Sequence, residues 1–576
     1  MKKALALVLA LALALSLVAC GGAPASTSGS TSGSASATAT GGLYPGTADP
    51  EGITVNLASE PPEMNPLTTT DSTSMNVLLH IYQGMMYLDA EDNAVPGVAE
   101  SYEVSEDGLT YTFKLKEGLT WSNGEPVTSA DFVFGLRTFF TPETAGDYQS
   151  TWATLIQGAE AAFKGEAPVE DIGIEAPDEY TVVYHLNNPA PYFLSVLAFP
   201  SFFPINEKGW NDCGGLDGYG TEADKMVTNG AYNITEWQHQ DHITLTKNDN
   251  YWNAAEEASI KTIKFVMIDD TNTALNGFMT GEYDMIGLSG QQKKDLEAEG
   301  AAKLSQYADG GVWYFEYNVT QPGLSNAKVR QALTMGIDIP SFMENIVMND
   351  SKAANCFTPD AVKGADGVTG SFNAAAGDLI DHSSDFEAAK ALLEEGLAEE
   401  GMTVDDLEIS ILTDTGDTAA KNCAFFQEQW KTNLGLTNVT VDQQEFQSRL
   451  DKMSNRDFSV VFAGWSCDYN DPNSYLDLWI TGGGNNHTGW SNAEYDQYIA
   501  DAAQEADPEA REELLLAAEK LLCEEQPIGP IYYRYRDYAT SDKLDGVVRS
   551  AFQDMNFLIA TITAAKINER MPSSNE

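Results

Sequence analysis

Basic residues are scarce in this chain of 576 residues, where 32 Lys and Arg stand against 86 Asp and Glu for a formal net charge of −54. Binding of nucleic acid needs a basic face for phosphate contacts, so this composition argues against a nucleic-acid partner. Electrostatic attraction to an anionic membrane surface is disfavoured for the same reason. The excess of acids indicates the solubility of an exported protein, and a preference for cationic ligands is the alternative interpretation.

Motifs of catalysis and metal binding are also missing. The chain has no GxSxG, HExxH, P-loop or GxGxxG pattern, and it contains only six His and six Cys. None of the cysteines shows a CxxC or Cys/His spacing typical of a metal site. We therefore expect no enzyme, no cofactor and no metal. Without Cys20 an odd number of cysteines remains, and the sequence does not choose a disulfide pair among Cys213, Cys356, Cys423, Cys467 and Cys523.

A long apolar run lies at the N-terminus. Met1-Lys2-Lys3 precede residues 4–19, which are almost all Ala, Leu and Val, and Cys20 ends the run. Charge, apolar core and small final residues predict a secretory signal peptide over residues 1–20, too short for a membrane-spanning helix. The ending Leu-Val-Ala-Cys resembles a bacterial lipobox, which implies cleavage before Cys20, acylation of its thiol and an extracytoplasmic lipoprotein anchored in the cell membrane. An ordinary signal peptide with an incidental cysteine is the alternative.

Residues 21–49 are dominated by Gly, Ala, Ser and Thr. Such residues bury little apolar surface, so we predict a disordered, flexible linker. Roughly 530 residues follow, more than one hydrophobic core usually holds, which predicts two or three domains. The two acyl chains of a diacylated cysteine are enough for stable anchoring, so contact with the membrane is expected through the lipid alone.

Strand and helix patterns alternate along the rest of the chain, which predicts an α/β protein. Asp71 or Ser72 is expected to cap the first helix. Strands at 407–412 and 439–441 enclose a helix and predict a parallel βαβ unit. Further strands are predicted at 53–58, 110–116 and 457–463, and another strand system is expected to start at residue 313. Helical spacing of apolar residues predicts helices at 75–87, 128–139, 326–335, 385–395, 419–433 and 508–525.

A candidate binding segment lies at the end of the strand at 457–463, where Gly464 and Trp465 are followed by Asp468 and turn-forming residues. Ligands of open α/β sheets bind at the carboxyl ends of strands. There an acid can bind an ammonium group through charge-assisted hydrogen bonds, and a Trp offers a broad apolar wall. Gly464 would let the backbone approach a ligand closely. Capping of the following turn is the alternative role for Asp468.

Several stretches resemble the family 5 extracellular solute-binding proteins of ABC importers, the oligopeptide- and dipeptide-binding group. The resemblance covers nearly all of residues 50–560. It rests on VPGVAESYEVSEDGLTYTF at 95–113, WSNGEPVTSADFV at 121–133, NGAY at 229–232, YW at 251–252, VRQAL at 329–333 and AGWSCDYNDP at 463–472.

The resemblance implies a two-lobed periplasmic-binding-protein-like fold of type II, with an extra domain on one lobe and the ligand cleft between the lobes. Closure about a hinge would enclose the ligand. The implied bounds are 83–228 for the extra domain and 312–530 for lobe 2. Lobe 1 is then discontinuous and comprises 50–82, 229–311 and 531–576.

The resemblance also implies the binding residues. In peptide-binding members an acid that Asp468 matches binds the α-ammonium of the peptide, and Tyr314 matches an aromatic residue near the hinge. The segment that pairs with the peptide backbone as an added strand matches Thr70, Asp71 and Ser72. The remaining expected ligand-binding residues surround Asp468 and are Gly464, Trp465, Ser466, Cys467 and Tyr469.

Two features depart from the pattern or stay open. Some members have a disulfide between positions that are Gly311 and Ser466 here, so this bridge is not expected, and Cys467 has no evident partner. The group that binds the ligand's carboxylate is unassigned, with Arg449 and Lys452 as candidates by charge alone.

The sequence therefore predicts a lipoprotein that captures short peptides and delivers them to the permease subunits of an ABC importer, acting as a monomer. One alternative is the same fold binding another solute, such as a nickel chelate, heme or an oligosaccharide. A second is a peptide-sensing receptor. An enzyme is disfavoured by the missing catalytic motifs.

Overall fold

The computed structural model describes residues 44–563, except Glu91, Pro191, residues 301–302 and 365–370, Ala506 and Asp554. These residues belong to one compact unit, Gly41–Glu576. The predicted signal peptide with Cys20, the linker up to residue 43 and the C-terminal residues 564–576 lie outside the described residues. In the described part of the chain, no helix combines the length and the apolar character needed to cross a membrane.

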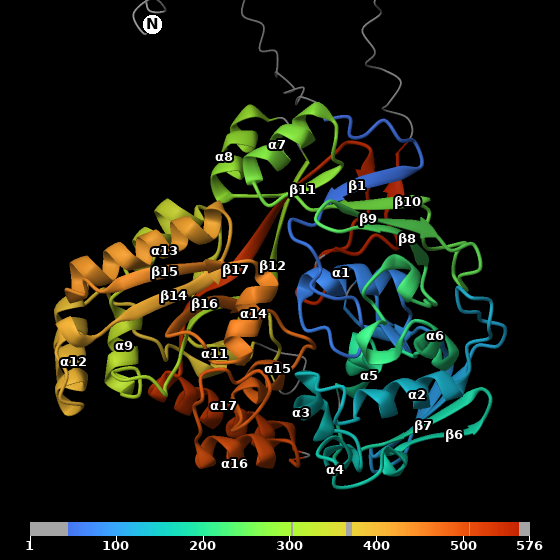
Figure 1. Ribbon diagram of the computed structural model, residues 1–576, viewed down its shortest axis with the longest axis horizontal. Coiled ribbons are helices and arrows are strands. Elements are labelled where there is room, and N and C mark those ends of the chain that lie inside the picture. The colour runs from blue at the N-terminus through green and yellow to red at the C-terminus, as the bar shows by residue number, and fades with distance from the viewer. Residues whose placement is uncertain are drawn as a thin grey trace, which may run out of the picture. The chain divides into compact units, whose positions relative to one another are not determined.

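Among the described residues, eleven strands form one mixed sheet, in the order β15-β14-β16-β12-β17-β11-β1-β10-β9-β8 with β13 paired to β17 (Figure 1). The α/β class predicted from the sequence is confirmed. The strands of this sheet are β1 (Gly52–Asn56), β8 (Tyr232–Gln238), β9 (His242–Lys247), β10 (Thr262–Val266), β11 (Met285–Leu288), β12 (Lys303–Tyr317), β13 (Lys352–Ala353), β14 (Ile409–Asp414), β15 (Val439–Gln444), β16 (Val460–Trp465) and β17 (Ile528–Thr540).

The two long strands β12 and β17 connect the two halves of this sheet (Figure 1). At one end they pair through Lys303 and Thr540 beside β11, and at the other β12 pairs with β16 from Val312 onward. We call the β1, β8–β11 side lobe 1 and the β14–β16 side lobe 2. The register of β12 and β17 shifts between Ala308 and Val312, and such a bulge interrupts the ladder and bends the strand. The strand system expected to start at residue 313 was wrong, because residues 303–317 form one strand through both lobes.

Lobe 2 contains the βαβ unit predicted from the sequence. Strands β14 and β15 pair in parallel, and α13 (Asp417–Gln429) lies between them in the chain. Aromatic rings fill the core beneath, with Phe315 of β12 5.1 Å from Trp430 and 5.4 Å from Phe462. The other helices of this lobe are α9 (Ala327–Met335), α10 (Ile339–Phe342), α11 (Phe372–Ala376), α12 (Phe386–Glu399), α14 (Phe446–Ser454), α15 (Asn473–Leu476), α16 (Ala493–Ala502) and α17 (Pro508–Glu525).

A second sheet, β4-β5-β7-β6, belongs to what we call the extra domain. Its buried side chains and those of lobe 1 form one continuous apolar cluster, so the two pack as a single core. Its elements are β4 (Ala99–Val104), β5 (Thr110–Leu115), β6 (Ile174–Asp178), β7 (Thr181–His185), α2 (Ser129–Phe139), α3 (Tyr148–Ala153), α4 (Ala159–Phe163), α5 (Phe193–Val196) and α6 (Glu207–Asp212). The remaining elements are α1 (Ser72–Ile81), α7 (Thr271–Thr280), α8 (Gly290–Glu299), β2 (Met86–Leu88), β3 (Ala94–Pro96), β18 (Leu544–Asp545) and β19 (Thr561–Ile562).

The first predicted helix was right in its cap and wrong at its C-terminus. Asp71 is the N-cap of α1, but the helix ends at Ile81 rather than at residue 87. Tyr82 takes an extended conformation, and Gln83 exchanges two 2.9 Å hydrogen bonds with the side chain of Asn229. These bonds replace the next helical ones, so the apolar residues that follow form β2 instead.

A buried ion pair in lobe 1 also binds the first described residues of the chain. Asp284 and Lys543 are both fully buried, with 3.3 Å between Oδ2 and Nζ. The Asp284 carboxylate also accepts hydrogen bonds from the backbone N–H groups of Thr47 and Thr54, each at 2.9 Å. Three segments distant in the sequence therefore meet at one carboxylate.

We expect Lys543→Met to lower the free energy of unfolding by about 3–5 kcal/mol, because it leaves the Asp284 charge buried without its counter-ion. Chemical denaturation measures the change. The control is Lys261→Met, which breaks an exposed pair with Glu51 and should cost less than about 1 kcal/mol. Equal effects of the two substitutions would contradict the role assigned to the buried pair.

Candidate functional site

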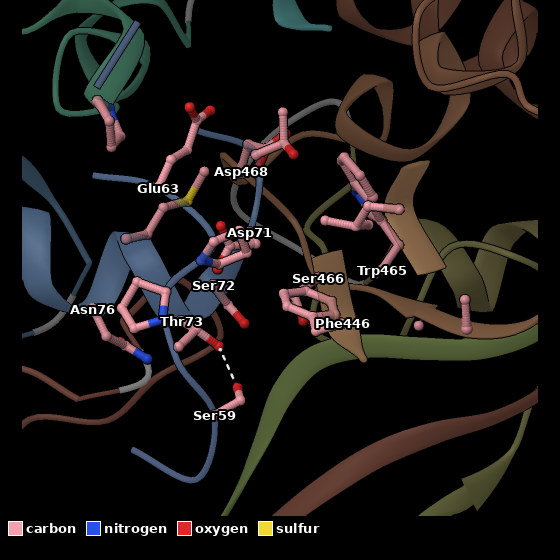
Figure 2. Close-up of a pocket in the computed structure, with 18 of the residues that line it drawn as sticks. Ser59, Glu63, Asp71, Ser72, Thr73, Asn76, Phe446, Trp465, Ser466 and Asp468 are labelled. Carbon is pink, nitrogen blue, oxygen red and sulfur yellow. Dashed lines mark hydrogen bonds between the residues drawn. The ribbon is translucent and has the colours of Figure 1, made fainter. Parts of the chain in front are cut away.

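A cavity of about 1740 Å³ lies between elements of lobe 1, the extra domain and lobe 2. One wall comprises residues 58–63 and 68–76 at the start of α1, with residues 145–148 of the extra domain. The opposite wall comprises the turn after β14, helix α14 and the end of β16. Figure 2 shows side chains from both walls facing the space between them.

Asp468 reaches this cavity from the turn after β16. Its backbone N–H donates to Ser474 Oγ at 2.8 Å, and its Oδ1 accepts a 2.8 Å hydrogen bond from the hydroxyl of Tyr148. Burial raises the pKa of Asp468 to about 8, against the lowering effect of the Tyr148 hydrogen bond. Among the described residues, no Lys, Arg or His forms an ion pair with this carboxylate.

The neighbouring acid Asp471 has a different environment. Both of its carboxylate oxygens accept 2.8 Å hydrogen bonds from the Arg511 guanidinium, in a buried bidentate pair. Asp471 therefore stabilises the turn, while Asp468 keeps its charge available. Capping alone does not explain Asp468, since its side chain is directed at Tyr148 of the extra domain.

The other predicted residues of this segment divide into two groups. Trp465 and Ser466 line the cavity; the Trp465 indole N–H donates to Ser474 O at 3.1 Å, and Ser466 Oγ accepts from Arg534 at 3.2 Å. Tyr469 is not among the residues of the cavity wall and stacks on Tyr192 with 4.7 Å between the ring centroids, so its role as a ligand contact stays a prediction.

Glycine and cysteine in this segment are explained by packing. A Cβ on Gly464 would lie 2.8 Å from the Trp313 indole, so close packing within the sheet requires glycine there. Cys467 touches the cavity edge, is buried and lies with its Sγ 3.6 Å from Ala551 O. Within the described ranges the cysteines are buried, free thiols.

The segment Thr70–Ser72 lines the cavity at the start of α1. The Asp71 carboxylate is occupied by its own helix, accepting from Ser74 N at 2.8 Å and Ser74 Oγ at 2.7 Å, and burial raises its pKa to about 6. Thr70 belongs to no strand, and among the described residues its backbone N–H makes no hydrogen bond to backbone. The Thr70–Ser72 segment therefore offers main-chain groups, because its one carboxylate, Asp71, is already hydrogen-bonded within α1.

The opposite wall also has unpaired backbone. Strand β16 pairs with β14 only at Val460 and Val461, while its pairing with β12 continues to Trp465. Residues 462–465 of β16 therefore have one open edge, and they line the cavity. An open edge is a template for another strand.

The remaining candidates behave differently from one another. Tyr314 is 4% exposed and lines the cavity, and among the described residues its hydroxyl has no hydrogen-bond partner. Arg449 also lines the cavity, but its Nε already donates to Asp414 at 2.7 Å. Lys452 lies off the cavity wall and pairs with Asp442 at 2.8 Å, so it does not reach a ligand there.

Sequence reasoning missed Tyr148, which completes the Asp468 environment from 320 residues away. It also missed His487, whose Nδ1 lies 3.4 Å from the buried Glu316 carboxylate on the cavity wall. Neither residue stands in a local pattern that marks it, because each is defined by a partner that is distant in the sequence.

The two neighbouring acids should affect stability in opposite directions. The pKa of Asp468 rises from 3.8 to about 8 on folding, so the unfolded state binds fewer protons and unfolding becomes easier as pH rises through this window. The neutral variant Asp468→Asn should therefore be more stable than the native chain at pH 9 and similar at pH 4. Asp471→Asn should be less stable, because Arg511 loses its buried partner. Denaturation midpoints at both pH values measure this, and a destabilised Asp468→Asn at pH 9 would contradict it.

Comparison with known proteins agrees with this geometry. The profile of the bacterial extracellular solute-binding proteins, family 5, matches residues 93–487. The oligopeptide-binding protein OppA of Bacillus subtilis (strain 168) is 34% identical over 536 residues, covering 90% of this chain and 94% of the relative. The dipeptide-binding protein DppE of the same strain is 31% identical over 503 residues, covering 87% of this chain and 90% of the relative.

Solved structures confirm the predicted two-lobed fold. Listeria monocytogenes OppA bound to peptide matches with a TM-score of 0.83 and 27% identity, over 90% of this chain and all of that structure. The profile match alone covers more than half of the chain. The chain therefore belongs to the bacterial extracellular solute-binding proteins, family 5.

Proposed function

We propose that this chain is the substrate-binding component of an ABC importer and captures short peptides in the cavity between its lobes. The observation that carries the proposal is Asp468, a buried carboxylate in a cavity with no cationic partner among the described residues. An α-ammonium group supplies the missing charge. The relatives support peptides as the ligand class, since their names describe oligopeptide- and dipeptide-binding proteins and one structure is described as bound to peptide.

The backbone edges on both walls support an extended peptide. A peptide beside residues 462–465 of β16 continues the sheet by main-chain hydrogen bonds, which need no particular side chain. The Thr70 segment offers main-chain groups on the other wall. The cavity of about 1740 Å³ exceeds the roughly 300–1,000 Å³ of common small-molecule sites, which favours a ligand of several residues.

The division into lobes belongs to the same proposal. We assign residues 50–82, 229–311 and 531–576 to lobe 1, 83–228 to the extra domain and 312–530 to lobe 2. Bending at the register shift of β12 against β17 would open and close the cavity. Tyr148 and Asp468 then form a contact that exists only in the closed state.

We expect Asp468→Asn to weaken the binding of a free tetrapeptide by about 2–5 kcal/mol, because the ammonium loses its charged partner. Isothermal titration calorimetry at pH 8.5 measures this, with the exposed Asp457→Asn as the control. N-acetylation of the peptide should reduce the binding free energy of the native protein by a similar amount. It should change the binding free energy of Asp468→Asn little. Affinity of the native protein should also fall as the pH is lowered, because a protonated Asp468 offers no charge to the ammonium group. Unchanged affinity in Asp468→Asn would contradict the assignment.

The native ligand can be identified directly. Native mass spectrometry of the purified protein should show a set of co-purifying peptide masses. A single metal chelate, heme or oligosaccharide in their place would contradict the peptide assignment.

The membrane anchor is a separate part of the proposal. We assign a diacylated Cys20 as the mature N-terminus, outside the cytoplasm, joined to the binding domain by the linker at 21–49. A tether of this kind raises the effective concentration of the binding protein at a permease. The described residues begin at Tyr44, and the backbone N–H of Thr47 donates to Asp284, so the last residues of this segment are bound to lobe 1 and the tether would be the part before Tyr44.

Cys20→Ser should move the protein from the membrane fraction to the medium or the soluble extract, because the acyl chains are lost. Cell fractionation with immunoblotting measures this, and intact-mass analysis should show the loss of the lipid mass. Cys213→Ser, a buried cysteine in the domain, is the matched control and should stay with the membrane. Membrane retention of Cys20→Ser would contradict the anchor.

A further inference from the structure

A second group of carboxylates lies in the cavity near the Asp468 site. Glu63 at the start of the α1 wall and Asp147 of the extra domain both line it (Figure 2 labels Glu63). Burial raises the pKa of both, and the Asp71 and Asp147 charges raise that of Glu63 further. Among the described residues, neither Glu63 nor Asp147 forms an ion pair with Lys or Arg, whereas the cavity's Arg449 and Arg534 are paired with Asp414 and Asp309.

Asp147 is placed as a binding group rather than as a structural one. It stands at the N-terminus of α3, yet its side chain makes no capping hydrogen bond. The loop of His487 packs against it, since a Cβ on Gly484 would lie 2.7 Å from Asp147 O and Gly484 N donates to Ser150 Oγ at 3.3 Å. The Asp147 backbone therefore lies against the lobe 2 loop that carries His487, and the charges of Asp147 and His487 act on each other.

The lobe 2 wall of the cavity adds a free polar group. The Tyr314 hydroxyl has no hydrogen-bond partner in the described chain, although the residue is only 4% exposed and lines the cavity. Glu316, two residues along β12, lies 3.4 Å from His487. Burial lowers the pKa of His487, but the charges of Glu316 and Asp147 outweigh this and the net pKa is raised. One imidazolium thus faces two carboxylates, and the subsite retains negative charge together with an unused hydroxyl.

We infer that this subsite binds a second cationic group of the ligand, so that the protein prefers peptides with a Lys or Arg side chain near their N-terminus. The inference rests on the proposed function and names its substrate class. Asp147 is the main partner of the basic side chain, with Glu63 beside it and Tyr314 as a further hydrogen-bonding group. The aromatic rings of Tyr314 and Trp479, 5.8 Å apart and edge to face, form an apolar wall for the methylene stem.

The position of the basic residue follows from the chain connection between the two sites. Asp147 is adjacent in sequence to Tyr148, whose hydroxyl contacts Asp468. The two carboxylates are therefore separated by about the length of one tyrosine side chain and one Cα step of 3.8 Å. Residues of an extended peptide advance about 3.3 Å each, and lysine adds a reach of four methylenes. A basic side chain on one of the first three residues spans this separation.

Calorimetry with three tetrapeptides tests the inference. Ala-Lys-Ala-Ala carries the second cation, Ala-Met-Ala-Ala is a neutral peptide of similar side-chain length, and Ala-Glu-Ala-Ala carries the opposite charge. The series is repeated with the charged residue first and third. We expect the best-placed Lys peptide to bind about tenfold tighter than its Met counterpart, as for a charge-assisted hydrogen bond, and the Glu peptide to bind weaker than both.

Variants locate the effect. Asp147→Asn should reduce the Lys-to-Met ratio to below about threefold while leaving the Met peptide within about twofold of its native Kd. Glu63→Gln should reduce the ratio less. Glu143→Gln, an exposed acid on the same loop and away from the cavity wall, is the matched control and should retain the full preference. Retention of the preference by Glu143→Gln and its loss in Asp147→Asn would support the subsite.

Two results would overturn the inference and leave the proposed function intact. One is equal affinity of the native protein for the Lys and Met peptides at all three positions. The other is a Lys preference that survives the combined Asp147→Asn and Glu63→Gln substitutions. Failure of the native protein to bind any of the peptides is a different result, which would refute peptide capture itself.

Discussion

A carboxylate held in a cavity without a counter-ion among the described residues is the constraint on which the rest of this structure depends. Removing an ion from water costs several kcal/mol, and a single hydrogen bond from Tyr148 does not offset that cost at Asp468. Another acid of the same turn is paired. The carboxylate of Asp471, three residues later, accepts two hydrogen bonds from the Arg511 guanidinium. In the proposed function, Asp471 thus stabilises the turn and Asp468 binds the ligand.

The same constraint connects ligand binding to closure of the lobes. Asp468 belongs to lobe 2 and Tyr148 to the extra domain, which shares its core with lobe 1. In the proposed function, closing buries the carboxylate, and without a cation this burial opposes the closed state. An ammonium group removes the penalty, so its differential interaction with the closed state shifts the population toward closure. Strands β12 and β17 provide the place to bend, because their ladder is interrupted where the chain passes from one lobe to the other.

Local patterns in the sequence predicted what local physics determines. Alternation and helical spacing located β5, α2 and α17, and Asp71 was foreseen as a cap because capping depends on residues three positions apart. The end of α1 at Ile81 depends on Asn229, far along the chain, and no helical period contains that information. Asp468 could be proposed because an acid after a strand end is a local signal. Its partner Tyr148 and the acid Asp147 could not, since only the fold brings them to the cavity.

The net charge is a second property whose meaning the sequence alone does not determine. A total of −54 fits either a soluble exported protein or a receptor for cations, and composition does not separate them. The positions of the acids do separate these interpretations. Exposed charges are screened within about 8–10 Å at physiological salt, whereas charges in an enclosed cavity are screened much less. Exposed acids such as Glu143 act on solvent. Glu63, Asp147 and Asp468 act on whatever fills the cavity, and they do so without lysine or arginine partners of their own in the described chain. The acids proposed to select a ligand are therefore a small, buried minority of those that set the charge of the chain.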